Sequence, residues 1–171
     1  MTRLPYAIFA ALLGGAAILQ LATTGALPDR IPTHFGASGV PNAWMTRGGY
    51  TTFMLAFTVG LPILVVAAIG VLPRLAPRLV NLPNRDHWLA PGRREASLAY
   101  LGRHACWLGC MMVLMGAGAH VLIVRASSSS PPRLEQGLFL GLLSVFLGAM
   151  VVWIVALVRR FPRPRQTGRF R

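Results

Sequence analysis

Four long apolar runs, separated by polar connections, limit what this chain can fold into. The runs cover residues 4–24, 52–72, 102–124 and 137–158. A helix needs about 20 mostly apolar residues to cross the hydrocarbon core of a bilayer. Hydrophobic residues make up 54% of the 171-residue chain and charged residues only 12%, about half the charged fraction of a typical soluble protein. The sequence predicts an all-α integral membrane protein with four transmembrane helices in a bundle.

The basic residues indicate how the helices are oriented. All 17 are arginine, and the formal net charge is +13. Most of them flank the apolar runs instead of forming one patch, so we expect no binding to nucleic acid. With the N-terminus in the cytoplasm, 13 of the 17 arginines lie on the cytoplasmic side. This bias follows the positive-inside rule and predicts a bacterial plasma-membrane protein with both termini cytoplasmic.

Three of the runs have features of their own. Residues 4–24 follow Arg3 and resemble a signal peptide, but the run is longer than the usual core of about 7–15 residues, so we expect a retained helix. Gly60-Leu61-Pro62 should kink or loosen the second helix. Residues 91–124 contain no internal proline. A continuous helix of that length exceeds the hydrocarbon thickness, so it should protrude or bend, with a kink expected near Gly102.

The connection at residues 27–44 is the most distinctive polar segment. Its prolines fix φ and its glycines permit tight reversals, so we expect an ordered, turn-rich outer loop between the first two helices. Phe35, Trp44 and Tyr50 suit the headgroup layer. Two interpretations stay open, a loop that lies on the membrane and a recognition surface for an extracytoplasmic ligand.

A second polar segment, residues 81–95, lies on the predicted cytoplasmic side. Asn84 and Asp86 favour turns, and Trp88 can anchor at the interface. The arginines of this loop and of the C-terminal tail can pair with anionic lipids. The Asp86-His87 pair hints at a metal, but such dipeptides are common, and we predict no metal site.

Together the two segments resemble a bacterial membrane family known as domain of unknown function number 1648. The first loop has the family pattern LP-x-x-IP-x-H-F-x-x-x-G-x-P-x-x-W, carried here by Leu27, Pro28, Ile31, Pro32, His34, Phe35, Gly39, Pro41 and Trp44. Many members also have N-L-P-N-x-D-x-W-L-A-P, found here at residues 81–91. His87 stands where an aromatic residue is expected.

The family is similar to the N-terminal module of SdpI-type immunity proteins, which protect bacteria against a secreted peptide toxin and help to signal its presence. Those proteins have more spans than the four expected here. The resemblance implies a module at residues 1–100, followed by a second helical hairpin at 101–160 and a basic cytoplasmic tail at 161–171.

We predict that the first loop binds or senses an extracytoplasmic peptide or a partner membrane protein. The residues expected to make that contact are Asp29, Arg30, His34, Asn42 and Trp44. The cytoplasmic motif is represented by Asn81, Pro83, Asn84, Asp86 and Trp88. The alternative is a small-solute transport component or a membrane-complex scaffold.

Weaker signals lie within the runs. Near the outer end a polar cluster beneath the His34 loop is one interpretation, and ordinary interfacial polarity is the other; its members are Gln20, Thr23, Thr24 and His120. Cys106 and Cys110 share a helix face and should be buried thiols. Small-residue faces for helix packing, within the bundle or in a dimer, are offered by Ala10, Gly14, Ala11, Gly15, Gly137 and Gly141.

No pattern in the sequence indicates an enzyme. Gly-x-Ser-x-Gly, the Walker loop and His-Glu-x-x-His are all absent from the sequence. His104 and His120 lie about 24 Å apart on one helix, too far to hold one haem iron. We therefore expect neither enzymatic activity nor a cofactor.

Overall fold

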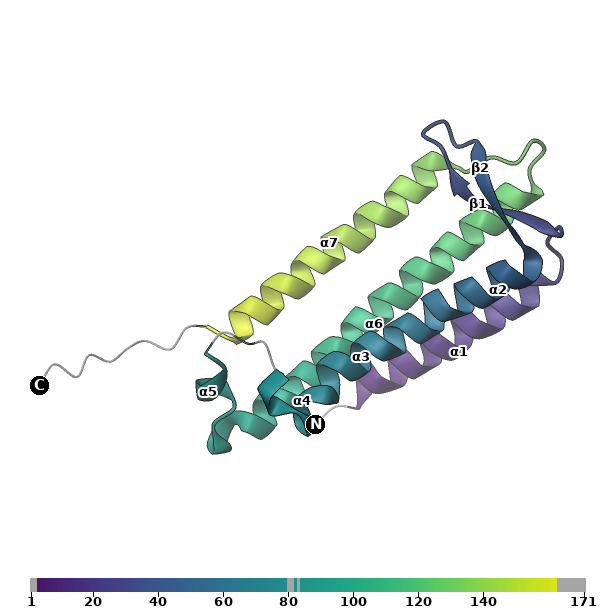
Figure 1. Cartoon of the computed structure of the whole chain (residues 1–171). Coiled ribbons are helices and arrows are strands. Elements are labelled where there is room, and N and C mark those ends of the chain that lie inside the picture. The colour runs from purple at the N-terminus through teal and green to yellow at the C-terminus, as the bar shows by residue number, and fades with distance from the viewer. Residues whose placement is uncertain (1–2, 80–81, 83, 163–171) are drawn as a thin grey trace, which may run out of the picture.

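The protein is mostly helical, with one small β-hairpin (Figure 1). The computed structural model describes residues 3–79, 82 and 84–162. Four helical segments in this part of the chain are long and apolar enough to cross a membrane: Leu4–Thr24, Arg47–Leu75, Pro91–Ser128 and Gln136–Arg160. The chain is thus a multi-pass membrane protein.

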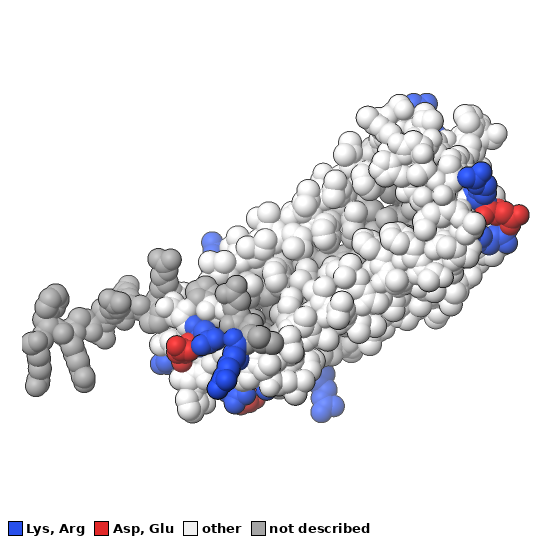
Figure 2. Space-filling model, viewed as in Figure 1, with Lys and Arg blue, Asp and Glu red and all other residues white. Residues whose placement is uncertain are grey.

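The long helices run side by side, with the hairpin at one end of the molecule and the start of the first helix and the end of the last at the other (Figure 1). We call these the hairpin end and the basic end. On the face in Figure 2, charged side chains gather at the two ends and the band between them is free of charge. The basic end carries nine arginines among the described residues: Arg3, Arg74, Arg78, Arg85, Arg93, Arg94, Arg103, Arg159 and Arg160.

Helix α1 has the bounds that its apolar run predicted, Leu4–Thr24. Pro5 suits the first turn, where its missing N–H has no partner in any case. At the other end the hydroxyls of Thr23 and Thr24 donate to the carbonyls of Leu19 and Gln20, at 2.7 and 2.6 Å. These hydroxyls are therefore satisfied within the apolar environment.

The chain then forms the hairpin, which corrects the all-α prediction. Strands β1 (Arg30–Phe35) and β2 (Pro41–Thr46) pair antiparallel, with irregular register around His34. The prolines and glycines predicted only turns. Pro32 lacks the N–H that a central strand needs, but a two-stranded sheet has only edges, where proline is tolerated.

The second span is divided by a wider turn. It consists of α2 (Arg47–Leu55), the π-helix η1 (Ala56–Gly60) and α3 (Leu61–Gly70), and α4 (Leu72–Leu75) extends it. Leu61 N–H bonds to the carbonyl of Ala56, five residues back. Pro62 has no N–H and crowds the carbonyl four residues earlier, so the predicted loosening at Gly60-Leu61-Pro62 takes the form of a π-turn.

Short elements connect this span to the longest helix. They are η2 (Pro77–Leu79) and α5 (Arg85–Trp88). Helix α6 then runs from Pro91 to Ser128 as one α-helix and passes through Gly102 without a break. The additional residues of the helix lie at the basic end, and its protrusion from the membrane stays a prediction. No interruption of the α-helix is found at the expected kink near Gly102.

Glycines on α6 let the other helices approach closely. Gly102, Gly109 and Gly116 recur every seven residues. A Cβ at Gly109 would lie 2.6 Å from Phe9 and from Val66, and one at Gly116 would lie 2.6 Å from the Thr58 hydroxyl. This stripe, which the sequence analysis missed, brings α1, η1 and α3 against α6.

The small-residue faces that we did predict pack differently. A Cβ at Gly14, Gly15, Gly137 or Gly141 would meet nothing within 4 Å among the described residues. These glycines do not serve packing within the bundle, and the dimer alternative stays a prediction. Cys106 and Cys110 are buried free thiols, as expected, in a core cluster with Phe9, Ala16 and Val113.

Helix α7 (Gln136–Arg160) contacts α6 but lies apart from α1 and α3 (Figure 1). Within the described part of the chain it has no buried side chain. The first three spans form the core, and the fourth is added at its side.

Candidate functional site

The hairpin is fixed to the helices by the inner side of β1. Ile31 is fully buried, and Leu27 just before the strand is 4% exposed. Both belong to a cluster with Tyr50 and Met54 of α2, and Ile123 of α6 packs against it. The hairpin is therefore part of the folded core at this end of the molecule.

Three of the residues predicted to bind are exposed on the hairpin, namely His34, Asn42 and Trp44. His34 and Asn42 are brought together across the strands, with the His34 Nδ1 2.5 Å from the Asn42 Oδ1. Trp44 pairs with Pro32 in the register and is 41% exposed. An exposed tryptophan beside a histidine–amide pair combines apolar area with hydrogen-bonding groups, a combination typical of recognition surfaces.

The two charged candidates do not join this group. Asp29 pairs with Arg47 at 2.8 Å, and the Arg47 N–H also bonds to the Asp29 carbonyl at 3.0 Å. This double contact closes the base of the hairpin, so Asp29 is structural. Arg30 is exposed and has no ion pair among the residues described.

The tip of the hairpin is bound to the connection between α6 and α7. Gly39 has φ of +78°, a conformation that glycine adopts without strain. Its carbonyl accepts from Leu134 N–H at 2.9 Å. Arg133 donates to the Ser38 carbonyl at 3.0 Å, and Gln136 donates to that of Ala37. No local sequence pattern signals these contacts.

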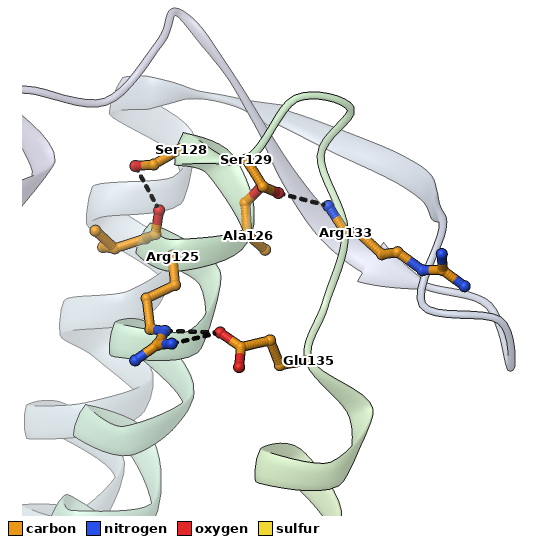
Figure 3. A network of polar contacts seen from close by, with 7 residues as sticks. Arg125, Ala126, Ser128, Ser129, Arg133 and Glu135 are labelled. Carbon is orange, nitrogen blue, oxygen red and sulfur yellow. Dashed lines mark hydrogen bonds and ion pairs between the residues drawn. The ribbon is translucent and has the colours of Figure 1, made fainter.

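This connection is itself held in place (Figure 3). Arg125 pairs with Glu135 at 2.7 Å, and the Ser129 hydroxyl accepts from Arg133 N–H at 3.0 Å. The hairpin, the end of α6 and the start of α7 therefore form one linked structure.

Beneath the hairpin lies a hollow of about 420 Å³, here called the hairpin groove. β1, the second span, α6 and α7 all contribute to its walls. The lining side chains are mostly apolar and aromatic: Thr33, His34, Phe35, Phe53, Met54, Phe57, Ala119, Leu122, Ile123, Leu134 and Phe139. An apolar pocket with a few polar groups at its edge is the usual form of a ligand site.

A buried polar junction lies next to the groove. His120 is fully buried, with its Nδ1 2.7 Å from the Tyr50 hydroxyl and its Nε2 2.7 Å from the Thr23 hydroxyl. One imidazole thus joins α1, α2 and α6; we call Thr23, Tyr50 and His120 the His120 junction. Of the polar cluster suggested by the sequence, Thr23 and His120 are bonded to each other, whereas the Thr24 hydroxyl bonds to its own helix. Tyr50, expected at the headgroups, is fully buried and bonds to His120 instead.

Two further buried side chains lack partners near this level. Both amide atoms of Gln20 and the hydroxyl of Thr58 have no hydrogen bond among the described residues. Gln20 is 1% exposed and Thr58 fully buried. Unsatisfied polar groups are costly in an apolar interior, so the hairpin half of the bundle contains hydrogen-bonding capacity that the fold does not use.

The second predicted motif lies at the basic end, so the structure does not bring the two motifs together (Figure 1). Asn84 has φ of 54° and begins α5. Asp86 pairs weakly with Arg85 at 3.3 Å on the surface. Trp88 packs edge-on against Phe161, with the Arg160 guanidinium over its ring. Asn81 and Pro83 lie outside the described residues, as do the arginines of the tail after residue 162.

The comparison with known proteins bears on the hairpin. Residues 11–60 match a family of unknown function. Its description is "Domain of unknown function (DUF1648)". The match includes the five predicted loop residues, Tyr50 and Thr58, and it excludes His120 and the segment at 81–91. No curated protein and no solved structure matches the chain.

Proposed function

We propose that the protein binds an extracytoplasmic peptide or a partner membrane protein through its hairpin groove, and that this binding supports an SdpI-like role in immunity or signalling. The observation that carries the proposal is the apolar groove of about 420 Å³ beneath the exposed His34. In this arrangement Phe35, Phe53 and Phe57 receive apolar side chains, and the His34–Asn42 pair and Trp44 contact the ligand at the entrance. The protein acts by binding and not as an enzyme.

The orientation in the proposal follows from charge. Nine arginines of the described residues lie at the basic end and four at the hairpin end, namely Arg30, Arg47, Arg125 and Arg133. The positive-inside rule then places the basic end in the cytoplasm of a bacterial inner membrane. The hairpin groove faces the extracytoplasmic side, where a secreted ligand arrives.

The His120 junction supports a signalling component. Met54 and Ile123 line the groove and also belong to, or pack against, the cluster of Tyr50. A ligand that moves these side chains acts on Tyr50, whose hydroxyl bonds to His120 on α6. Three helices meet at this imidazole, so a change in the groove is transmitted to all of them.

Transport is the second candidate, and the distribution of polar groups disfavours it. Buried polar residues lie in the hairpin half (Gln20, Thr24, Thr58 and His120) and toward the basic end (Ser97 and His104), and the core cluster between these two groups contains Phe9 and Val113. A path for a polar solute would need hydrogen-bonding groups through that level. An uptake assay in proteoliposomes that shows flux would favour transport over binding.

The test of binding uses a photoreactive phenylalanine analogue at position 139, in the groove wall. In cells exposed to medium from competing bacteria, we expect a defined adduct. The adduct should be lost when Ala119→Leu fills the groove, and weakened by His34→Ala and Trp44→Ala. The same analogue at Val145, which is 73% exposed on α7, is the matched control. Equal adducts from both positions, or adducts indifferent to Ala119→Leu, would contradict the proposal.

A further inference from the structure

A second hollow lies nearer the basic end, between α7 and α1. It has a volume of about 600 Å³, and we call it the α1–α7 groove. Ile8 and Leu12 of α1 form one wall, Val152 and Trp153 of α7 the other, and Trp107 and Met111 of α6 the floor. Apart from His104, the side chains around it are apolar or thiol groups. Its interior is therefore suited to hydrocarbon.

The mouth of this groove is basic. A smaller hollow of about 330 Å³ adjoins it, sharing His104 and Trp107 and adding Arg103 and Tyr100. Arg103 is partly buried and forms no ion pair among the described residues. Arg160 lies nearby, with its guanidinium 5.4 Å from the centre of the Tyr100 ring. An unpaired arginine at the end of an apolar channel is complementary to an acidic headgroup above an acyl chain.

The length of the groove indicates whether it fits a lipid acyl chain or a transmembrane helix. Along α6 it extends from His104 to Leu114, about 15 Å at 1.5 Å per residue. That is half of the roughly 30 Å hydrocarbon core, or one leaflet. Beyond Leu114 the continuation between α6 and α7 has only about 130 Å³. A transmembrane helix of a second copy would need the full thickness, whereas the chain of a lipid in the leaflet at the basic end needs half.

At the mouth of the groove, His104 of α6 and Trp153 of α7 contact each other through both side chain and backbone. His104 stacks on Trp153 at 4.5 Å between ring centres, its Nε2 lies 3.0 Å from the Trp153 carbonyl, and the Trp153 indole donates to the His104 carbonyl at 2.9 Å. These bonds hold α6 and α7 at a fixed spacing beside Arg103. The groove is thus kept open by protein contacts and does not depend on its occupant.

We propose that the α1–α7 groove binds an anionic phospholipid of the leaflet at the basic end, with one acyl chain along Met111 and Trp153 and the phosphate at Arg103. The site is separate from the hairpin groove and from the arginine-rich loop and tail. Its ligand is defined by two chemical features, a chain of about one leaflet in length and a negative headgroup at the interface.

The test uses quenching of tryptophan fluorescence by lipids with brominated acyl chains. In a Trp44→Phe, Trp88→Phe background, only Trp107 and Trp153 report, and both line the groove. The full-length protein is reconstituted in mixtures of phosphatidylglycerol and phosphatidylcholine, with bromine on one lipid at a time. We expect brominated phosphatidylglycerol to be preferred about fivefold at this site, the ratio that one arginine contact provides.

Two variants localise the preference. Arg103→Gln should abolish it, whereas Arg78→Gln, which removes an exposed charge at the same end, should preserve it. Ala149→Phe, which fills the groove, should also abolish it with Arg103 intact. If Ala149→Phe prevents insertion, Val152→Phe in the same wall serves instead.

Three results of the quenching experiment would overturn the proposal. They are equal quenching by the two lipids in the parent protein, a preference that survives Arg103→Gln, and a preference that Arg78→Gln removes as completely. A disulfide-linked dimer formed through Val152→Cys would assign the groove to a second copy of the chain and equally exclude the lipid. Because these measurements report only on Trp107 and Trp153 at the α1–α7 groove, their failure leaves the proposed function untouched.

Discussion

The first three spans pack against one another differently from the way the fourth span packs against them. In the first three, glycines of α6 remove side chains from the contact, so that Phe9, Val66 and Thr58 lie against its backbone. Helix α7 approaches α6 closely at Gly118, opposite Leu142, and is otherwise held by polar and aromatic contacts at its two ends. The difference explains why hollows lie between α7 and the other helices, and why both proposed ligand sites use α7 as a wall.

Two histidines on α6 show the same contrast. His120 is fully buried and joins α1, α2 and α6 through hydroxyl groups. His104 is 8% exposed and joins α6 to α7 by stacking and by one bond to a backbone carbonyl. The first belongs to the interior of the core, and the second to a seam between the core and an added helix.

The largest expected effect comes from filling the glycine stripe. Gly109→Leu places atoms where Phe9 and Val66 already lie, and overpacking of this kind costs about 1–3 kcal/mol. Unfolding in detergent, followed by circular dichroism, should show the loss. Gly148→Leu on α7, where a Cβ meets nothing within 4 Å, is the matched control and should change stability by less than about 0.5 kcal/mol. Equal losses would mean that α7 packs as tightly as the core.

Exchanging the two histidines for phenylalanine sharpens the comparison. His120→Phe leaves the buried Tyr50 hydroxyl without its partner, so we expect a loss of about 1–3 kcal/mol. His104→Phe keeps a ring against Trp153 and loses one hydrogen bond, which costs about 0.6 kcal/mol on average in membrane proteins. The same unfolding assay measures both. A larger effect at His104 would reverse our assignment of core and seam.

Gly39→Ala tests the seam at the hairpin end. The substitution forces φ of +78° on an alanine and brings its Cβ to 2.7 Å from the Leu134 carbonyl; the left-handed conformation alone costs about 1–2 kcal/mol. We expect the tip to detach from the start of α7, so the Leu134 amide should exchange its hydrogen faster. Amides of α1, remote from the tip, provide the internal control. Unchanged exchange at Leu134 would show that the tip does not depend on this contact.

The smallest effect is expected from Glu135→Gln. The Arg125–Glu135 pair is about half exposed on both sides, and surface ion pairs contribute about 0–1 kcal/mol. The change in unfolding free energy should stay near the lower limit and vanish in high salt, because mobile ions screen exposed charges. A loss that persists at high salt would make this pair a principal attachment of α7.

The sequence predicted the parts of the fold that depend on local composition. The bounds of α1 agree with the prediction because the bilayer requires a fixed apolar length. The strands were missed because proline and glycine signal turns locally, and only the paired partner shows that Ile31 and Met45 face each other. Gly14 and Gly109 look alike in sequence, since which face of a helix lies inside depends on its neighbours.

The candidate site was predictable only in part. The loop residues His34 and Asn42 were expected and do lie together. Tyr50 was assigned to the interface because an aromatic residue at a helix start fits there equally well. Its partner His120 lies 70 residues away, and no local pattern reports such a contact.

The π-turn at Ala56–Gly60 determines where the second span tolerates the deletion of a residue. Its buried residues are spaced four or eight positions apart, at Tyr50, Met54, Thr58, Pro62 and Gly70. In a regular α-helix such a row rotates by about 40° at each step of four, and the wider turn offsets part of that rotation by accommodating one extra residue. Loss of one residue within 56–60 would restore a normal turn and leave Tyr50 and Gly70 on their present faces. Loss of one residue within 63–69 would turn Gly70 about 100° away from Gly102, so the length of this span is fixed more strictly after the proline than within the π-turn.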